Sequence, residues 1–461
     1  MEKKVVIFFF CLLAVSSTYA QGKKNKKSET PRTNIKFEQF KLDNGLDVIL
    51  HQDKTTPIVA VSVLYHVGSK NEDPDRTGFA HFFEHLLFEG SENIKRGQFD
   101  KLVSGAGGTS NANTSADRTF YYVILPSNQL ELGLYLESER MLHAKIEEVG
   151  VETQREVVKE EKRQRFDNQP YMSFYPEIFK RAFENTSYEW TPIGSLEHLS
   201  AATLDEFMEF YKKFYVPNNA TLSIAGDIDI AQTKKLVEKY FNEVPKGTVD
   251  IPRPEFKDVK RDKEIRDVVY DNIQLPAVFQ AYLMPAQGTE DYYALDMLNT
   301  LLSGGESSRL NKELVDNQEK ALQIASFPYA MEEKGIFIML GIANMGVSIE
   351  ELENSLNMEI EKVKKDLVSE QEFQKVKNQV ENDFISGNSS VAGIAENLAN
   401  YHVYFGDANL INTEIERYNK VTREDLKRVA NQYLVKENRI VLQYLPKSAQ
   451  TQQDDTQLNN E

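Results

Sequence analysis

Cysteine is almost absent from this chain of 461 residues. Its single cysteine, Cys11, lies inside an apolar run near the N-terminus. Disulfide bonds therefore cannot stabilise the fold, and cysteine nucleophiles and thiolate metal sites are excluded. A chain of this length must be stabilised by large packed cores, and the length predicts two domains of about 200 residues each.

The chain also lacks an excess of positive charge. Its formal net charge is -17, with 71 acidic residues against 54 lysines and arginines. A surface of this sign repels a phosphate backbone, so we expect no nucleic-acid partner.

Long hydrophobic runs are missing as well, apart from one at the start of the chain. Residues 5–15, "VVIFFFCLLAV", follow two lysines and precede "SSTYA", which ends in a small residue. This order is typical of a secretory signal peptide (residues 1–20), with cleavage expected after Ala20. The run is too short to span a bilayer comfortably, so we expect no stable membrane anchor. The mature protein is predicted to be exported, to the periplasm in a Gram-negative bacterium and otherwise by secretion.

One pattern occurs twice in the chain. Residues 202–226 align without a gap on residues 421–445, and the same offset aligns residues 56–65 on 275–284. Each longer segment reads as a capped amphipathic helix, a turn containing asparagine and a strand. Two copies of one unit explain this repetition most simply.

The repeat defines a predicted domain organisation. We expect homologous domains at 35–248 and 265–446, joined by a proline-containing, charged linker at 249–264. The fold class is predicted to be α+β, each domain being a mixed, mostly antiparallel sheet covered by helices. Residues 21–34 read as a flexible leader and residues 447–461 as a disordered tail.

The sequence "HFFEH" at residues 81–85 carries the clearest chemistry. Because residues three and four apart share one face of a helix, His81, Glu84 and His85 project together. Two imidazoles one turn apart can bind a zinc ion, and a glutamate beside them can act on a metal-bound water. Burying these groups beside Phe82 and Phe83 without partners would cost several kcal/mol, and a metal would remove that cost.

A third metal ligand is expected further along the chain, because a catalytic zinc normally takes three protein ligands. The glutamates of residues 151–168 are candidates. The residue types alone do not choose among Glu152, Glu156, Glu160 and Glu161. By itself this segment reads as a solvated, salt-bridged helix face.

Together with "GGTSNANTSADRTFYY" at 107–122 and "REVVKEEKRQRFDNQP" at 155–170, this motif resembles the inverzincin zinc metallopeptidases. These include pitrilysin, insulin-degrading enzyme and the mitochondrial processing peptidase. The chain is similar to the zinc-bearing subunit of the short, bacterial processing-peptidase-like branch. The resemblance implies an endopeptidase with one zinc ion per chain, which hydrolyses peptides or unfolded segments through a zinc-activated water. It also implies that the two domains form half of a clamshell, with zinc ligands only in the first domain.

The resemblance assigns the metal site residue by residue. His81 and His85 would be zinc ligands and Glu84 the catalytic base. The family's pattern resembling R-x-V-V-x-x-E implies Glu161 as the third ligand, with Glu160 as the alternative.

Two further expectations concern the surroundings of the metal. Asn111 and Ala112 would lie on an edge strand that receives the substrate as an added strand. Gln154 stands where family members commonly have a glutamate. It would act behind the ligands, and its neutral amide would alter metal affinity or the pH optimum.

The resemblance also implies that a partner is required. Active members place a second domain pair opposite the zinc, and an arginine and a tyrosine of that pair reach the substrate. In this chain Val315 and Leu322 stand at the corresponding positions and cannot donate such hydrogen bonds. We therefore expect a heterodimer with a homologous chain that supplies the arginine-tyrosine pair. An alignment shift to Arg309 and Tyr329 is the alternative.

Two other functions compete with the peptidase. Some family members are catalytically silent scaffold subunits, and a subunit that only binds peptides is the second rival. The complete set of His81, Glu84 and His85 favours the peptidase.

Overall fold

The computed structural model describes residues 34–450, and residues 35–450 belong to one compact unit. The predicted signal peptide, nearly all of the leader and most of the tail lie outside the described residues. None of the helices in this described part combines the length and the hydropathy that crossing a membrane would require.

The first sheet has six strands, and its neighbours are antiparallel except for one pair, β2 and β6. Its spatial order is β1 (Glu38–Lys41), β2 (Asp47–Gln52), β6 (Ala220–Gly226), β3 (Ile58–Tyr65), β5 (Thr119–Pro126) and β4 (Thr109–Thr114). Strand β4 is therefore an edge strand. The buried, β-branched residues of β2, β3 and β6 form the centre of this sheet.

The second sheet repeats this arrangement without a counterpart of β1. Its order is β7 (Ile265–Asp271), β11 (Arg439–Pro446), β8 (Ala277–Pro285), β10 (Lys334–Ala343) and β9 (Ala321–Tyr329), and only β7 and β11 are parallel. The offset found in the sequence relates the first residue of β3 to the first residue of β8. The same offset relates the start of α7 (Leu204–Phe214) to the start of α14 (Arg423–Tyr433). The predicted α+β class, with two mixed, helix-covered sheets, is confirmed.

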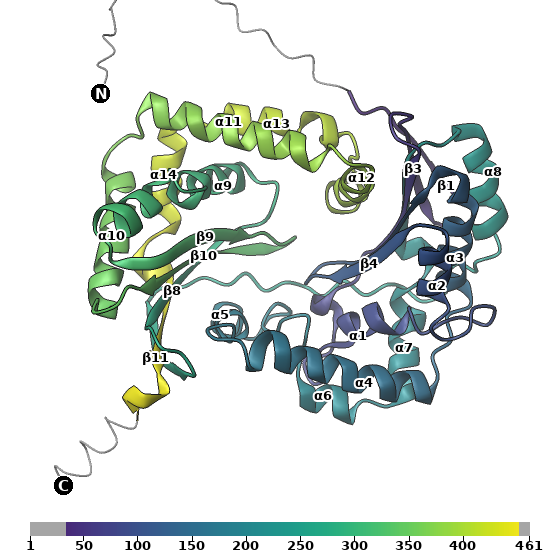
Figure 1. Cartoon of the computed structure of the whole chain (residues 1–461), viewed down its shortest axis with the longest axis horizontal. Helices are drawn as coiled ribbons and strands as arrows, with labels where there is room; N and C mark the ends of the chain where they lie inside the picture. The colour runs from purple at the N-terminus through teal and green to yellow at the C-terminus, as the bar shows by residue number, and fades with distance from the viewer. Residues whose placement is uncertain (1–33, 451–461) are drawn as a thin grey trace, which may run out of the picture. The chain divides into compact units, whose positions relative to one another are not determined.

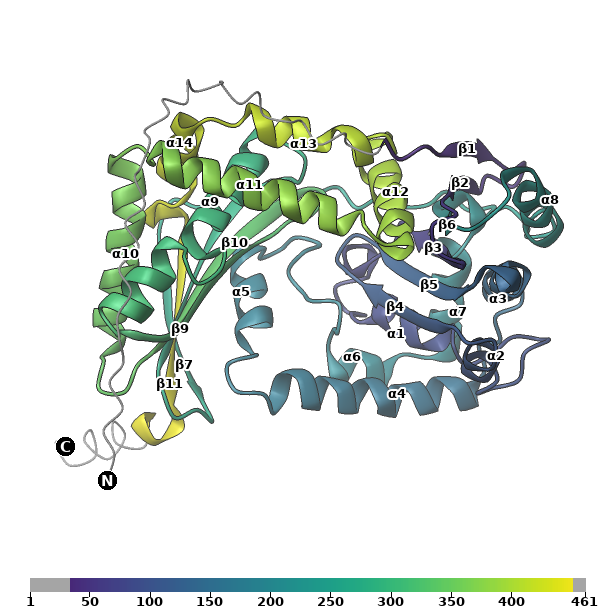
Figure 2. The same cartoon turned by 45° about the horizontal axis from the view of Figure 1, so that its top comes forward.

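Helices pack on both sheets (Figures 1 and 2). Those of the first half are α1 (Phe79–Leu86), α2 (Phe99–Gly105), α3 (Leu130–Leu142), α4 (Glu148–Lys162), α5 (Phe174–Ala182), α6 (Leu196–Ala201), α7 and α8 (Ile230–Phe241). Those of the second half are α9 (Glu290–Ser303), α10 (Ile349–Lys365), α11 (Glu370–Gly387), α12 (Val391–Phe405), α13 (Leu410–Lys420) and α14. Each half has its own large apolar core.

Each half also contributes a helix to the other half's sheet. Phe174 of α5 stacks on Phe279 of β8 with ring centroids 4.6 Å apart. In the opposite direction, Ile394 and Leu398 of α12 pack on Ile49 in the first sheet, and Figure 2 shows α12 lying against β3. Boundaries at 248 and 265 therefore remain a prediction, since the packing crosses them.

A buried ionic cluster joins the turn between β9 and β10 to the first half. The ammonium group of Lys70 is buried, lies 2.9 Å from a carboxylate oxygen of Asp117 and also pairs with Glu332. Nε2 of His66 lies 2.9 Å from the same oxygen of Glu332, and the Tyr188 hydroxyl donates to Asp117 at 2.6 Å. Buried charges persist when each has a partner, so this cluster holds the turn in place.

The cluster predicts a loss of stability in acid. Burial alone would raise the pKa of Glu332, but the hydrogen bond with His66 and the charge of Lys70 outweigh it and lower this pKa from 4.5 to about 2. The stabilisation is complete above about pH 4.5 and is lost as the pH falls towards 2. We expect Glu332→Gln to lower the melting temperature at pH 7 by several degrees, for a loss of roughly 2–3 kcal/mol.

The matched control is Glu333→Gln, because the Glu333 side chain is exposed. Thermal melts from pH 2 to 7 provide the measurement. Equal melting temperatures of the two variants at pH 7 would contradict this account of the cluster.

Candidate active site

Helix α1 is amphipathic in the way the sequence predicts. Phe79, Phe82, Phe83 and Leu86 are buried in the first core, whereas Glu84 and His85 of the opposite face are only partly buried. The Tyr121 hydroxyl donates a hydrogen bond to the carbonyl oxygen of Phe83 at 2.8 Å, which holds the helix at the sheet. The polar face of α1 is therefore fixed in orientation by its apolar face.

The N-terminus of α1 is capped from outside the helix. Gly78 precedes the helix with a φ of 98°, which glycine adopts without strain. The carboxylate of Glu72 accepts hydrogen bonds from the backbone N–H groups of Gly78 and Ala80, both at 2.8 Å, and from Nε1 of Trp190 at 3.0 Å. Burial raises the pKa of Glu72 to about 8 even though these hydrogen bonds oppose the rise, so the cap acts through hydrogen bonds and not through a full charge. This role of Glu72 was not predicted, although an acidic residue shortly before a helix is a recognisable signal.

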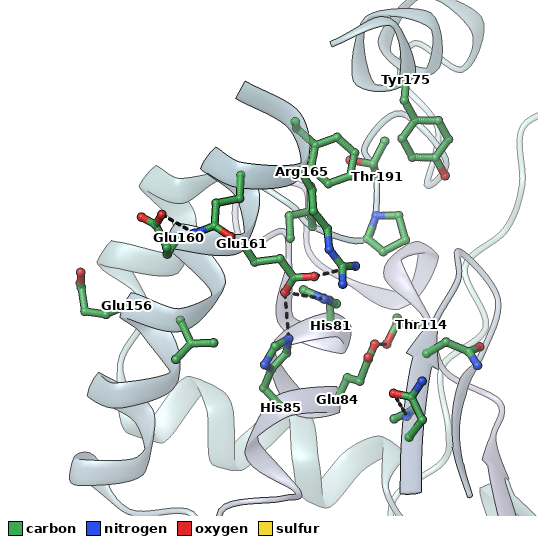
Figure 3. A pocket seen from close by; sticks show the side chains of 18 of the residues that line it. His81, Glu84, His85, Thr114, Glu156, Glu160, Glu161, Arg165, Tyr175 and Thr191 are labelled. Atoms are coloured by element: carbon green, nitrogen blue, oxygen red, sulfur yellow. Dashed lines mark hydrogen bonds and ion pairs between the residues drawn. The ribbon is translucent and has the colours of Figure 1, made fainter. Parts of the chain in front are cut away.

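Three side chains from two helices point toward one another (Figure 3). Nε2 of His85 lies 3.1 Å from a carboxylate oxygen of Glu161 on α4, and Nε2 of His81 lies 3.6 Å from the same oxygen. The second oxygen of Glu161 pairs with the Arg165 guanidinium at 2.9 Å. The structure thus brings together all three residues that the family resemblance implied as ligands.

This group fits a zinc ion. One possible ligand atom from each of His81, His85 and Glu161 lies within 4.8 Å of the others. Tetrahedral zinc bonds of about 2.0–2.1 Å place neighbouring ligand atoms roughly 3.3 Å apart, a value between the two measured distances. Two imidazoles and a carboxylate are also a donor set that zinc accepts in catalytic sites.

The electrostatics of the group suit metal binding. Burial, together with the neighbouring His85, lowers the pKa of His81 to about 4, so its imidazole is neutral at pH 7. The hydrogen bond from His85 lowers the pKa of Glu161, despite partial burial, and keeps it ionised. A neutral imidazole and a carboxylate are the protonation states that bind a metal ion.

Glu156 and Glu160 of α4 also line the cleft, but they are engaged with other side chains. Glu160 accepts a hydrogen bond from Gln164 at 2.8 Å, and its side chain is 54% exposed. Glu156 pairs with Lys159 at 3.0 Å, and Glu152 pairs with Arg155. Of the four candidates, only Glu161 adjoins the two histidines.

Glu84 lies beside the edge strand β4. Its carboxylate accepts a hydrogen bond from the Thr114 hydroxyl at 2.7 Å, and burial raises its pKa. Asn111, Ala112 and Thr114 of β4 all line the same cleft as the histidines. The role of Thr114 was not predicted, although strand alternation places it on the same face as Ala112.

The cleft has a volume of about 1070 Å³, which is large enough for several residues of a peptide. One wall is formed by α4 and another by β4. Beyond the predicted residues it is lined by Arg165, by Tyr175 and by Tyr329 of the second half (Figure 3 shows the first two). Tyr329, the alternative tyrosine of the sequence analysis, reaches this cleft through tertiary packing.

Gln154 does not line the cleft. Its amide N–H donates to the carboxylate of Glu89, which also pairs with Arg96, and its side-chain oxygen is buried without a hydrogen-bond partner among the described residues. Gln154 could influence the metal through α4, because this helix also carries Glu161. That influence stays a prediction.

The positions that correspond to the family's arginine-tyrosine pair, and their alternatives, are spread over the second half. Val315 packs against its core, Leu322 is 58% exposed, and Arg309 is held by Glu372 on α11 at 2.9 and 3.0 Å. Arg309 is therefore engaged within its own half.

The sequence matches two family models. Residues 47–193 match the family described as insulinase (peptidase family M16), and residues 201–380 match the peptidase M16 inactive domain. The zinc protease PqqE of Helicobacter pylori is 35% identical over 401 residues, which cover 86% of this chain and 90% of that protein. The chain belongs to the M16 peptidase family. It is a homologue of zinc proteases over most of its length, and the resemblance drawn from the sequence is confirmed.

Solved structures agree with this membership. The M16 chain superimposes on a protease from Helicobacter pylori with a TM-score of 0.86 and 34% identity, covering 89% of this chain and all of the other. The periplasmic protease PqqL from Escherichia coli gives a TM-score of 0.74 at 18% identity, which shows a common fold. That alignment covers 90% of this chain but 48% of PqqL.

The geometry predicts how metal content responds to substitution. We expect about one zinc ion per chain in the purified protein, and we expect His81→Ala, His85→Ala or Glu161→Gln to lose it, because each removes one of three ligands. Metal analysis after dialysis provides the measurement. Glu160→Gln is the matched control, since it makes the same change one residue away and should keep the zinc. Loss of zinc from Glu160→Gln but not from Glu161→Gln would disprove the assignment of the third ligand.

Proposed function

We propose that this M16 protein is a zinc-dependent endopeptidase that hydrolyses peptides or unfolded protein segments. The observation that carries the proposal is the convergence of His81, His85 and Glu161 in a cleft that also contains Glu84 and an edge strand. The name of the Helicobacter pylori relative, a zinc protease, supports it.

The chemistry assigned to each side chain follows from its position. His81, His85 and Glu161 would hold the zinc ion. When bound, zinc in such a site lowers the pKa of a water molecule to about 7 and polarises the carbonyl group to be attacked. Glu84 takes the proton of the attacking water and passes it to the leaving amine. Its raised pKa and the Thr114 hydrogen bond suit a group that accepts and then releases a proton.

Substrate binding is assigned to the free edge of β4. On its other side β4 pairs with β5, where Asn111 faces Tyr122 and Ala112 faces Tyr121, so the remaining edge is available to an extended peptide. Main-chain hydrogen bonding to such an edge accepts many sequences, which suits an enzyme acting on unfolded segments. Glu84 would then lie beside the added strand, because Thr114 at the end of β4 contacts it.

A silent scaffold or a purely peptide-binding subunit is the alternative. The grouping of His81, His85 and Glu161 with Glu84 beside them argues against both alternatives. A subunit without activity would need neither the three possible metal ligands nor the neighbouring carboxylate.

The peptidase proposal predicts the behaviour of Glu84→Gln. We expect this variant to keep its zinc and to lose at least a hundredfold in kcat, because the amide cannot accept the proton of the water. Cleavage of an unstructured peptide, monitored by mass spectrometry, provides the measurement. A variant that retained both zinc and full turnover would rule out the proposed mechanism and favour a different base.

We also propose a homologous partner chain. The arginine-tyrosine pair implied by the family resemblance is incomplete in this chain: Val315 and Leu322 stand in those positions, and of the alternative pair Tyr329 lines the cleft while Arg309 is bound to Glu372. The fold of this chain corresponds to about half of PqqL, which is consistent with a second domain pair being needed. The partner would lack the zinc motif and supply the pair.

The partner proposal predicts low activity of the isolated chain. Hydrogen bonds to a developing oxyanion contribute about 3 kcal/mol, so turnover without them should be roughly a hundredfold lower. Assays of the chain alone and of the complex isolated from its source cell provide the comparison, with zinc content measured in both. Equal turnover at equal zinc content would refute the need for a partner.

Export is the third part of the proposal. It rests on the signal-like residues 1–20, which lie outside the described part of the structure, and the related PqqL is described as periplasmic. We expect the mature protein to begin near Gln21 and to lie outside the cytoplasm, in the periplasm of a Gram-negative cell. N-terminal sequencing of the protein from fractionated cells provides the test, and a mature chain that still begins at Met1 would contradict it.

A further inference from the structure

A second cavity, of about 140 Å³, lies in the second half and shares no lining residue with the active-site cleft. It is formed by the turn before α9 and by helices α9, α12 and α13. Figure 2 shows α12 and α13 adjoining one another. The residues that matter for its chemistry are Tyr292, Asn400, Tyr401, Tyr404, Phe405 and Glu414.

Glu414 supplies the cavity with a carboxylate whose hydrogen bonds come from tyrosine hydroxyl groups. Its oxygens accept hydrogen bonds from the hydroxyl groups of Tyr293, at 3.1 Å, and Tyr401. Within residues 34–450 it forms no ion pair with lysine, arginine or histidine. The neighbouring Arg417 donates instead to the Tyr293 hydroxyl at 3.0 Å. Burial raises the pKa of Glu414, although the hydrogen bonds from Tyr401 and Tyr293 and the charge of Arg417 oppose that rise.

One further group makes the cavity attractive to a hydrogen-bond donor. The side-chain oxygen of Asn400 is buried and has no partner among the described residues. A buried acceptor without a donor costs free energy, so a ligand that donates a hydrogen bond to Asn400 would be stabilised there.

Aromatic rings line the remainder of the cavity. Tyr401 and Phe405 have centroids 6.3 Å apart, and Tyr404 and Phe405 lie 6.4 Å apart in an edge-to-face arrangement. Gly288 allows the turn before α9 to approach the Phe405 ring, where a side chain would collide with it. The faces of such rings attract cations, most strongly when water is excluded.

We propose that this cavity binds a small organic cation, an ammonium or guanidinium group carried by a free amine or by a basic side chain of a peptide. The carboxylate, the unpaired carbonyl oxygen and the aromatic rings all favour such a group. The volume suits it, because a cavity of about 150 Å³ holds a molecule the size of benzene. Calcium fits less well, since it takes six or more oxygen ligands and the cavity offers one carboxylate. The inference does not depend on peptide hydrolysis.

Isothermal titration calorimetry of the full chain with n-propylguanidinium tests the proposal, with n-propylurea as a neutral probe of the same shape. We expect saturable binding of the cation and at least tenfold weaker binding of the urea. Glu414→Gln should weaken cation binding at least tenfold. Glu416→Gln, the same change at an exposed site on the same helix, should leave it unchanged.

A second variant guards against a folding defect. Asn400→Leu removes the unpaired oxygen and partly fills the cavity while leaving the bonds of Glu414 in place, and it should also abolish binding. Equal affinity of urea and guanidinium, or unchanged binding in both Glu414→Gln and Asn400→Leu, would overturn the proposal. Competition titrations distinguish a free amine from a peptide side chain as the source of the cation. Bound n-propylguanidinium is displaced by putrescine in one titration and by an unstructured peptide with one arginine in the other. The stronger competitor identifies a free amine or a peptide side chain.

Discussion

The structure depends on one electrostatic requirement: the polar face of α1 needs compensation where water is largely excluded. Two imidazoles and a carboxylate project from a helix whose other face is packed in the core. Burying such groups without partners costs several kcal/mol. Glu161 of α4 and Thr114 of β4 supply part of the compensation, and a zinc ion would supply the rest. The two elements that converge on α1 are therefore those that also form the walls of the cleft.

The same requirement explains how rigidly α1 is supported. Glu72 caps its first turn, and Tyr121 binds a carbonyl group in its middle. Tyr121 is held in turn by the buried guanidinium of Arg140, which lies 4.4 Å from its ring centroid and close to the rings of Phe88 and Phe99. Metal ligands have to be positioned within about half an ångström, and fully packed supports provide that precision.

Each half packs one of its helices on the sheet of the other half, so the geometry of the active site depends on both halves. Helix α5 connects the segment after Glu161 to the second sheet, and Tyr329 of that sheet lines the cleft. The buried group of Lys70, Asp117 and Glu332 fixes the same region from another side. In the other direction α12 packs on the first sheet and lines the second cavity. A change in either half can therefore alter the geometry of the other.

Local spacing in the sequence determined α1 and its three polar residues, because helical periodicity depends only on neighbours three and four apart. The internal repeat likewise predicted two related sheets, since each copy carries its own pattern of burial. Residue types alone left four glutamates of α4 equivalent, and the family pattern was needed to single out Glu161. The geometry agrees with that choice, because of these four glutamates only Glu161 contacts the histidines of α1. Tertiary structure alone decided the contact of Thr114 with Glu84, the place of Tyr329 and the exchange of α5 and α12. These join segments far apart in the sequence, and which of many apolar faces pack together depends on the shape of the whole fold.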